Sequence, residues 1–109
     1  MANVTSIESL RSSPRAVLFE GGDDIDASIF VVTVERGEGP DLHVHPYPEV
    51  FVVQSGAGRF TVGEEETVVE GGNIVVVPAE TPHMFKGASD ETLRLVSFHP
   101  SPEVVQTEL

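Results

Sequence analysis

Short runs of β-branched and aromatic residues alternate with turn-forming residues along most of the chain. The runs occupy residues 16–20, 28–35, 49–53, 58–63, 66–70, 73–78 and 92–98. Between them lie clusters of glycine, aspartate and proline, which adopt the backbone conformations that tight turns need. No stretch longer than about ten residues has apolar positions at helical spacing. Many short strands at this spacing predict an all-β sandwich or barrel.

The amino-terminal residues differ from the rest of the chain. Residues 1–15 are rich in serine and lack the alternation, so we expect an arm with one turn of helix at most. No linker, repeat or low-complexity tract divides residues 16–109, and a chain of 109 residues has room for one hydrophobic core. We therefore expect residues 16–109 to form a single domain.

Alternation within the last predicted strand decides where its polar residues point. Leu93 and Leu95 form the more apolar face and are expected to point inward. The same parity carries Ser97 and His99 inward and leaves Arg94 in water.

Composition excludes several classes of protein. Hydrophobic residues make up 39% of the chain, too many for a disordered protein. The formal charge of −12 would repel phosphate backbones and anionic lipid, so we expect neither a nucleic-acid nor a membrane partner. No apolar run approaches the ~20 residues of a membrane span, and no signal-peptide pattern opens the chain. With no cysteine, the chain has no thiolate chemistry, and a reducing cytoplasm is the expected location.

Three histidines and one glutamate are spaced so that a folded strand and turn would bring them together. His43 and His45 lie two residues apart, on one face of a strand. Glu49 follows a Pro-Tyr-Pro turn, and His83 follows a second proline-bounded turn. Three imidazoles and a carboxylate suit a divalent transition metal and leave one or two coordination positions open.

The first of these segments carries a longer pattern. Gly37, His43, His45, Glu49 and Gly56 are separated by five, one, three and six residues. This spacing is similar to the first signature motif of the cupin superfamily at every fixed position.

The second segment resembles the second cupin motif. Gly72, Pro78 and His83 match it, whereas Glu80 stands where the family has glycine and Gly87 where it has asparagine. Fifteen residues separate the two motifs, which resembles the small single-domain microbial cupins.

The resemblance implies a double-stranded β-helix, or jelly-roll barrel, with one divalent metal inside. It implies that His43, His45, Glu49 and His83 hold this metal. Imidazole and carboxylate ligands leave Fe, Mn, Ni, Cu and Zn open.

Strand parity also predicts the surroundings of the metal. Phe51 shares the face of Glu49, Phe85 shares the face of His83, and Phe60 is expected across the sheet. Tyr47 is expected at the cavity mouth, where it either caps the opening or packs against the rim. These residues predict an apolar, partly aromatic cavity for a small aromatic or enolisable molecule.

Basic residues are expected to lie away from this cavity. The expected places are the arm (Arg11, Arg15), a turn (Arg36) and outward strand positions (Lys86, Arg94), with Arg59 undecided. A polycarboxylate or sugar-phosphate substrate is therefore disfavoured, because such ligands usually need inward arginine or lysine.

Two function classes stay open. The first is a metal-dependent enzyme, for which the resemblance implies a quercetinase-type dioxygenase or an isomerase or cyclase. Glu49 is then a fixed ligand or a base, and His99 is a candidate proton shuttle. The second is a non-catalytic module that binds or senses a small molecule.

A small jelly roll leaves an outer sheet face to cover, so we expect a homodimer. The predicted outer positions are Phe30, Val32 and Val34.

Overall fold

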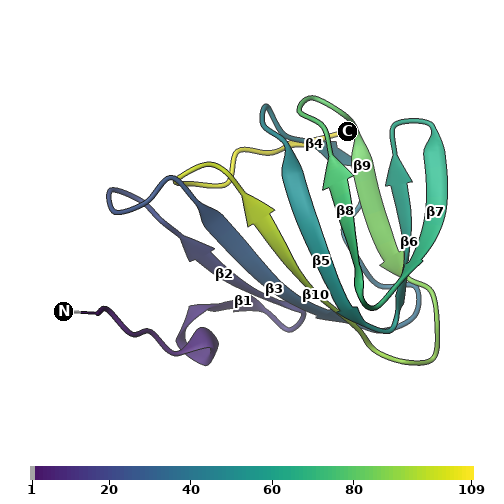
Figure 1. Cartoon of the computed structure of the whole chain (residues 1–109), viewed down its shortest axis with the longest axis horizontal. Helices are drawn as coiled ribbons and strands as arrows, with labels where there is room; N and C mark the ends of the chain where they lie inside the picture. Colours follow the sequence, from purple (N-terminus) through teal and green to yellow (C-terminus); the bar gives the residue numbers. More distant parts are fainter. Residues whose placement is uncertain (1) are drawn as a thin grey trace.

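The computed structural model describes residues 2–109 and shows two antiparallel β-sheets (Figure 1). One sheet has six strands in the order β1-β2-β3-β10-β5-β8, and the other has five in the order β11-β4-β9-β6-β7. The strands are β1 (Arg11–Ser13), β2 (Ala16–Glu20), β3 (Ser28–Val34), β4 (His43–Val44), β5 (Glu49–Ser55), β6 (Ala57–Val62), β7 (Glu65–Glu70), β8 (Asn73–Val77), β9 (His83–Gly87), β10 (Leu93–His99) and β11 (Thr107–Glu108). The all-β jelly-roll prediction is confirmed.

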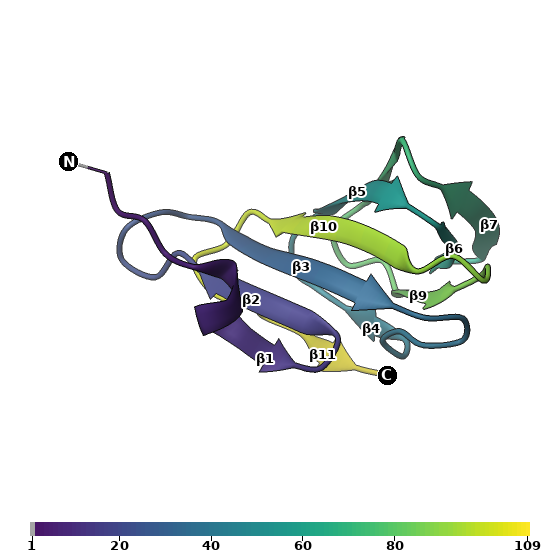
Figure 2. The ribbon, with the colours of Figure 1, turned by 90° about the horizontal axis from the view of Figure 1, so that it is seen from below.

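The amino-terminal arm is attached to the six-stranded sheet. A single 3-10 turn, η1 (Ile7–Leu10), leads into β1, which pairs with β2 at the edge of this sheet. Figure 2 shows η1 and β1 lying beside β2. No helix in the described chain is long and apolar enough to cross a membrane. The three-residue strand β1 was absent from the sequence prediction, because its exposed residues have no apolar alternation to be recognised.

The core lies between the two sheets. Its buried members come from both of them: Val32, Val34, Phe51, Val53, Phe60, Val77, Phe85, Leu93 and Leu95. Alternation in β10 is as predicted, because Leu93, Leu95, Ser97 and His99 are buried and Arg94 is exposed.

The sequence prediction for β3 assigned its side chains to the wrong faces of the sheet. Phe30 is the cross-strand partner of Ser97, and Val32 is the partner of Leu95. Directly opposed residues share a face of the sheet, so Phe30, Val32 and Val34 point inward with β10. The outward side chains of this strand are Ile29, Val31 and Thr33.

Two complete rows of apolar side chains cross the outside of the six-stranded sheet. One row is Phe19, Ile29, Phe98, Val50 and Val76, and the other is Val17, Val31, Val96, Val52 and Ile74. We call these ten residues the outer apolar face. Ile74 and Val76 are 64% and 61% exposed, whereas Val17 is 3% exposed, so within residues 2–109 this face is uncovered at the β8 edge and buried at Val17.

Two motif positions have a left-handed backbone, one occupied by glycine and one by glutamate. Gly56 has a φ of +73°, and a Cβ there would lie 2.5 Å from the carbonyl oxygen of Thr92. Glu80, which replaces the glycine of the second motif, has a φ of +58°. The turn therefore keeps the left-handed conformation that glycine would adopt, and the Glu80 N–H donates to the carbonyl oxygen of His45 at 2.8 Å.

Candidate metal centre

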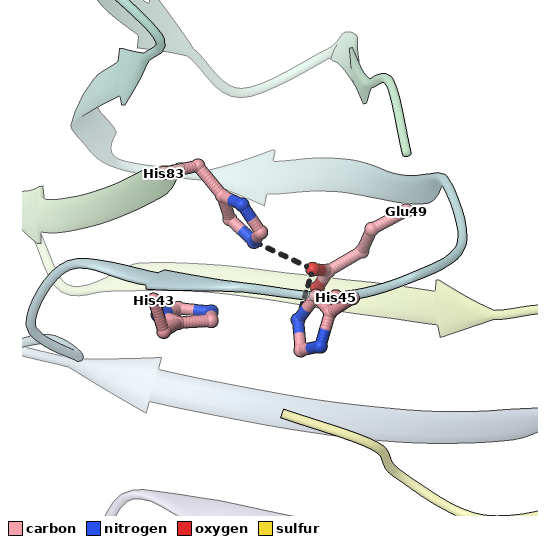
Figure 3. Close-up of side chains that lie close together, drawn as sticks. All are labelled: His43, His45, Glu49 and His83. Atoms are coloured by element: carbon pink, nitrogen blue, oxygen red, sulfur yellow. Dashed lines mark hydrogen bonds and ion pairs between the residues drawn. The ribbon is translucent and has the colours of Figure 1, made fainter. Parts of the chain in front are cut away.

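Three strand ends bring the predicted ligands together inside the barrel. His43 begins β4 and is the cross-strand partner of His83, which begins β9. Glu49 begins β5, and His45 lies just beyond β4. One ligand atom from each of the four lies within 4.8 Å of the others, and all four side chains are buried. Figure 3 shows His83 and His45 both contacting Glu49, with His43 beside them.

Backbone carbonyls fix the ring orientation of the three histidines in the ligand group. Each Nδ1 lies close to one carbonyl oxygen: 2.7 Å for His43 and Asp41, 2.8 Å for His45 and Val105, and 2.9 Å for His83 and Thr81. A carbonyl can only accept, so each Nδ1 carries the proton in the neutral ring. Each Nε2 then presents a lone pair to the interior, which is the arrangement found in metal-binding histidines.

The donor set fits a bound cation. Glu49 Oε1 lies 3.1 Å from His45 Nε2 and 3.0 Å from His83 Nε2. Lone pairs on both sides of these contacts repel unless a proton or a metal ion lies between them. The Nε2 of His45 is also buried without a hydrogen-bond partner. These residues therefore suit a divalent metal, held by three nitrogens and one oxygen.

The surroundings of Glu49, His43 and His45 shift the pKa values of these three residues. Burial raises the pKa of Glu49, but contacts with His45, His83 and His99 outweigh it, and the pKa lies well below its ordinary value. Burial lowers the pKa of His43, and the neighbouring imidazoles lower it further. Burial also opposes protonation of His45, but contact with Glu49 outweighs it and raises the pKa of His45. At neutral pH the carboxylate is thus ionised and His43 is neutral.

His99 and Tyr47 lie directly behind the carboxylate. His99 Nε2 is 3.0 Å from Glu49 Oε2, and His99 Nδ1 is 2.8 Å from the Tyr47 hydroxyl. Tyr47 stacks on the ring of His45, with centroids 5.1 Å apart and an interplanar angle of 6°. The inward direction predicted for His99 is what the structure shows.

A cavity of about 340 Å³ is lined by three of the four ligand residues, His43, His45 and Glu49. Its wall is mainly apolar, formed by Phe30, Val32, Val34, Phe51 and Phe85, and its polar side includes His43, His45, Glu49, Ser97 and His99. A volume of this size holds a small organic molecule. Metal ligands and a largely apolar wall therefore belong to one site.

Two residues expected at the cavity, Phe60 in its wall and Tyr47 at its mouth, do not line it in the described chain. Phe60 packs against Phe51 and Phe85, with ring centroids 5.2 Å and 5.4 Å apart, and does not line the cavity of the described chain. Tyr47 contacts His45 and His99 from outside the cavity and does not cap it. Phe51 and Phe85 line the cavity as expected.

Arg15 was expected on the arm, away from the site, but it lines the cavity. Pairing of β1 with β2 folds the arm back over the mouth, and sequence periodicity gave no sign of this pairing. The guanidinium is half exposed and lies 2.6 Å from the carboxylate of Glu38. Contact with Arg15 and with the Glu35 backbone lowers the pKa of Glu38 to about 2.

Val105 contacts the site through its backbone, a role that the sequence did not predict. Its carbonyl accepts from His45, and its N–H donates to the Tyr47 hydroxyl at 3.1 Å. Its side chain is 43% exposed, and backbone groups leave no mark on residue type, so no sequence signal could have found it.

A barrel with a buried group of three histidines and one glutamate defines a class of metal-binding β-proteins. Sequence comparison identifies the particular family, because a family model described as a cupin domain matches residues 30–99. The chain belongs to the cupin family.

Relatives in two streptomycetes share part of the sequence. The uncharacterized protein SCO3923 of Streptomyces coelicolor is 36% identical over 73 residues, covering 67% of this chain and 70% of the relative. Protein SchB of Streptomyces halstedii is 32% identical over 80 residues, covering 72% of this chain and 57% of the relative. Their names state no reaction.

Solved structures share the fold. Bacillus subtilis oxalate decarboxylase aligns with a TM-score of 0.78 at 22% identity, over 90% of this chain and 29% of its own. An oxalate oxidase in complex with glycolate aligns with a TM-score of 0.73 at 18% identity, over 89% of this chain and 57% of its own. This chain thus spans less than two thirds of both neighbours.

Proposed function

We propose that this chain is a metal-dependent enzyme that acts on a small, largely apolar, aromatic or enolisable substrate. The observation that carries this proposal is the shared location of the buried ligand group and the mainly apolar cavity. The reaction classes we propose are a dioxygenase reaction of quercetinase type and an isomerisation or cyclisation. Fe, Mn, Ni, Cu and Zn are the candidate metals.

Different residues of the site have different roles in such a reaction. When bound, a divalent metal supplies a Lewis acid for a substrate oxygen. Phe51 and Phe85 exclude water and hold the apolar part of the substrate. Glu49 Oε2, the oxygen that is not shared with His45 and His83, is the group we propose to receive a substrate proton.

Oxalate, which the structural neighbours' names mention, fits this cavity poorly. A small dianion needs positive side chains on the wall, and Arg15 is the arginine that lines the cavity in the described chain. Arg15 is half exposed and already paired with Glu38. We therefore propose a neutral or singly charged substrate.

The test starts with untagged protein purified without chelator. Elemental analysis should find about one equivalent of a transition metal, and the His43→Ala variant should lose it. The loaded protein is then assayed with a flavonol, a catechol and a cyclic 1,3-diketone, by O₂ uptake and by NMR of products, with oxalate as the contrasting substrate. Turnover of oxalate alone would contradict the proposed substrate class.

A non-catalytic binding or sensor module is the alternative outcome of the same experiment. It requires that none of these compounds is converted and that one of them raises the melting temperature of the metal-loaded protein. Such a result would reject the enzyme proposal and keep the metal site.

We also propose that two copies of this chain pair through the outer apolar face. Five strands about 4.8 Å apart make this surface roughly 20 Å wide, and its two rows contain no charged residue. A second copy offers the same surface without charged residues, whereas the chain as a whole carries a charge of −12. Face-to-face packing of two sheets is a common way to bury such a surface.

A further inference from the structure

A fourth histidine lies buried next to the metal centre without belonging to the ligand group. His99 is 1% exposed and ends β10, and its ring lies 5.4 Å from that of Phe30. The ligand atoms that lie within 4.8 Å of one another in residues 2–109 come from His43, His45, Glu49 and His83. His99 instead contacts the far oxygen of the carboxylate, with 3.0 Å between Nε2 and Oε2.

Tyr47 determines which ring nitrogen of His99 carries the proton. The Tyr47 hydroxyl oxygen accepts the Val105 N–H at 3.1 Å and lies 2.8 Å from His99 Nδ1. A phenol has one proton to donate, and Nδ1 is the acceptor that the structure offers to it. If Nδ1 carried a proton instead, the hydroxyl proton of the half-buried Tyr47 would lose this acceptor. His99 Nδ1 therefore accepts, and Nε2 carries the N–H.

The backbone groups of one residue, Val105, thus give two neighbouring histidines opposite tautomers. The Val105 carbonyl accepts from His45 Nδ1, which leaves His45 Nε2 as a lone pair for a metal. The Val105 N–H donates to Tyr47, whose own proton then goes to His99 Nδ1, which leaves His99 Nε2 as a donor. A ring whose inner nitrogen carries a proton cannot bind a metal through it.

We propose that His99, held as its Nε2–H tautomer by Tyr47, is a positioning residue for Glu49 and not a metal ligand. Attraction between the N–H and Oε2 turns Oε1 toward His45 and His83. The contact angle lies outside that of a regular hydrogen bond, so the attraction at 3.0 Å is mainly that between a dipole and an anion. Glu49 would then hold a metal through Oε1, while Oε2 stays with His99.

The inference rests on the proposed metal centre, and its first test needs no substitution. Uniformly ¹⁵N-labelled protein is loaded with Zn²⁺, which is diamagnetic, and long-range ¹H–¹⁵N spectra are recorded. We expect three rings with Nδ1–H and a zinc-bound Nε2, and a single ring, His99, with Nε2–H. A His99 ring that carries its proton on Nδ1, or binds zinc, would overturn the proposal.

Matched variants test the positioning role separately. His99→Gln keeps an N–H donor near the position of Nε2, whereas His99→Leu has a similar volume and no donor. We expect Zn²⁺ affinity to fall ten- to a hundred-fold in His99→Leu, as is typical for partners of metal ligands, and to be largely restored in His99→Gln. Equal affinities in the two variants would refute a positioning role.

The Tyr47→Phe variant tests the origin of the tautomer. Loss of the hydroxyl should leave the His99 proton free to move to Nδ1, with a smaller loss of Zn²⁺ affinity than in His99→Leu. An unchanged His99 tautomer would show that Tyr47 does not set it. If the unsubstituted protein binds no Zn²⁺ or other transition metal, the proposed function fails, while the tautomer of His99 is still read from the metal-free protein.

Discussion

His43 and His83 stand directly opposite each other where β4 meets β9, with their ring centroids 4.3 Å apart. This is the one residue pair in the register of these two strands. β4 itself has two residues, so little backbone pairing ties it to the sheet. A metal bound by both rings, and by Glu49 on β5, would tie three strands from the two sheets together.

Metal binding should therefore stabilise the protein strongly. At a free metal concentration a hundred times the dissociation constant, we expect about 2.7 kcal/mol of stabilisation. For a domain of this size that corresponds to a rise in melting temperature of roughly 10 °C. Differential scanning calorimetry with and without Zn²⁺ checks this, and the His43→Ala variant should show little of the rise. An equal rise in both proteins would place the bound metal elsewhere.

Metal affinity should increase with pH through the neutral range. The pKa of His45 lies above its ordinary value of 6.5, because its contact with Glu49 outweighs burial. The proton on His45 stabilises the metal-free fold below pH 6.5, and this contribution is lost as pH rises through the raised pKa. Metal must displace that proton, so binding near pH 6.5 should be accompanied by proton release.

Calorimetric titration in two buffers with different ionisation enthalpies measures this release. Glu49→Gln removes the negative charge that raises the pKa of His45, so this variant should release fewer protons. Affinity that is constant between about pH 6 and 8 would contradict the assigned direction.

Glu49→Gln also separates the ligand role of Glu49 from its proposed role as a base. The amide keeps the shape of the side chain and loses its charge, while the three histidines remain. We expect metal content to fall only partly and turnover to fall below detection. Metal analysis and activity are measured on the same preparation, and full activity would exclude Glu49 as the base.

Two motif glycines should respond differently to the same substitution. Gly37 and Gly56 both have positive φ, +81° and +73°. A Cβ on Gly37 meets nothing within 4 Å, whereas on Gly56 it lies 2.5 Å from a backbone oxygen. Gly37→Ala should cost about 1–2 kcal/mol from the left-handed conformation alone, and Gly56→Ala clearly more. Urea unfolding measures both, and equal losses would argue against the close approach at Gly56.

The proposed dimer is tested by one charge placed on the outer apolar face. Ile74→Lys introduces an ammonium group into one of its rows and should convert a dimer into a monomer. Val68→Lys is the matched control, because Val68 is 48% exposed but lies on β7 in the other sheet. Light scattering at micromolar concentration measures both variants. A monomeric parent protein, or dissociation by both substitutions, would reject this interface.

The ligand group could be predicted from sequence because its members recur at fixed intervals around turns. His43, His45, Glu49 and His83 were assigned on their spacing and on its resemblance to the cupin motifs, and the structure brings them together. The inward direction of His99 followed from alternation with Leu93 and Leu95, since β10 has a clear apolar face.

Alternation failed where both faces of a strand are apolar. Residues 29–32 of β3 are all hydrophobic, so a period of two carries no information there and the wrong face was chosen. The places of Arg15 and Val105 depend on pairing and backbone contacts between distant segments. Such contacts depend on the assembled barrel, which residue type alone does not describe.

The mouth of the cavity is made by segments near both ends of the chain. Ser13 and Arg15 come from the arm that pairs with β2, and Gln106 comes from the segment that leads into β11. The two segments differ in what else they do, because Val105, one residue before Gln106, also accepts from the metal-site residue His45. Exchanging the arm between such proteins should therefore change which molecules enter while the buried reactive centre stays intact, whereas exchanging the carboxy-terminal segment should also disturb the orientation of His45.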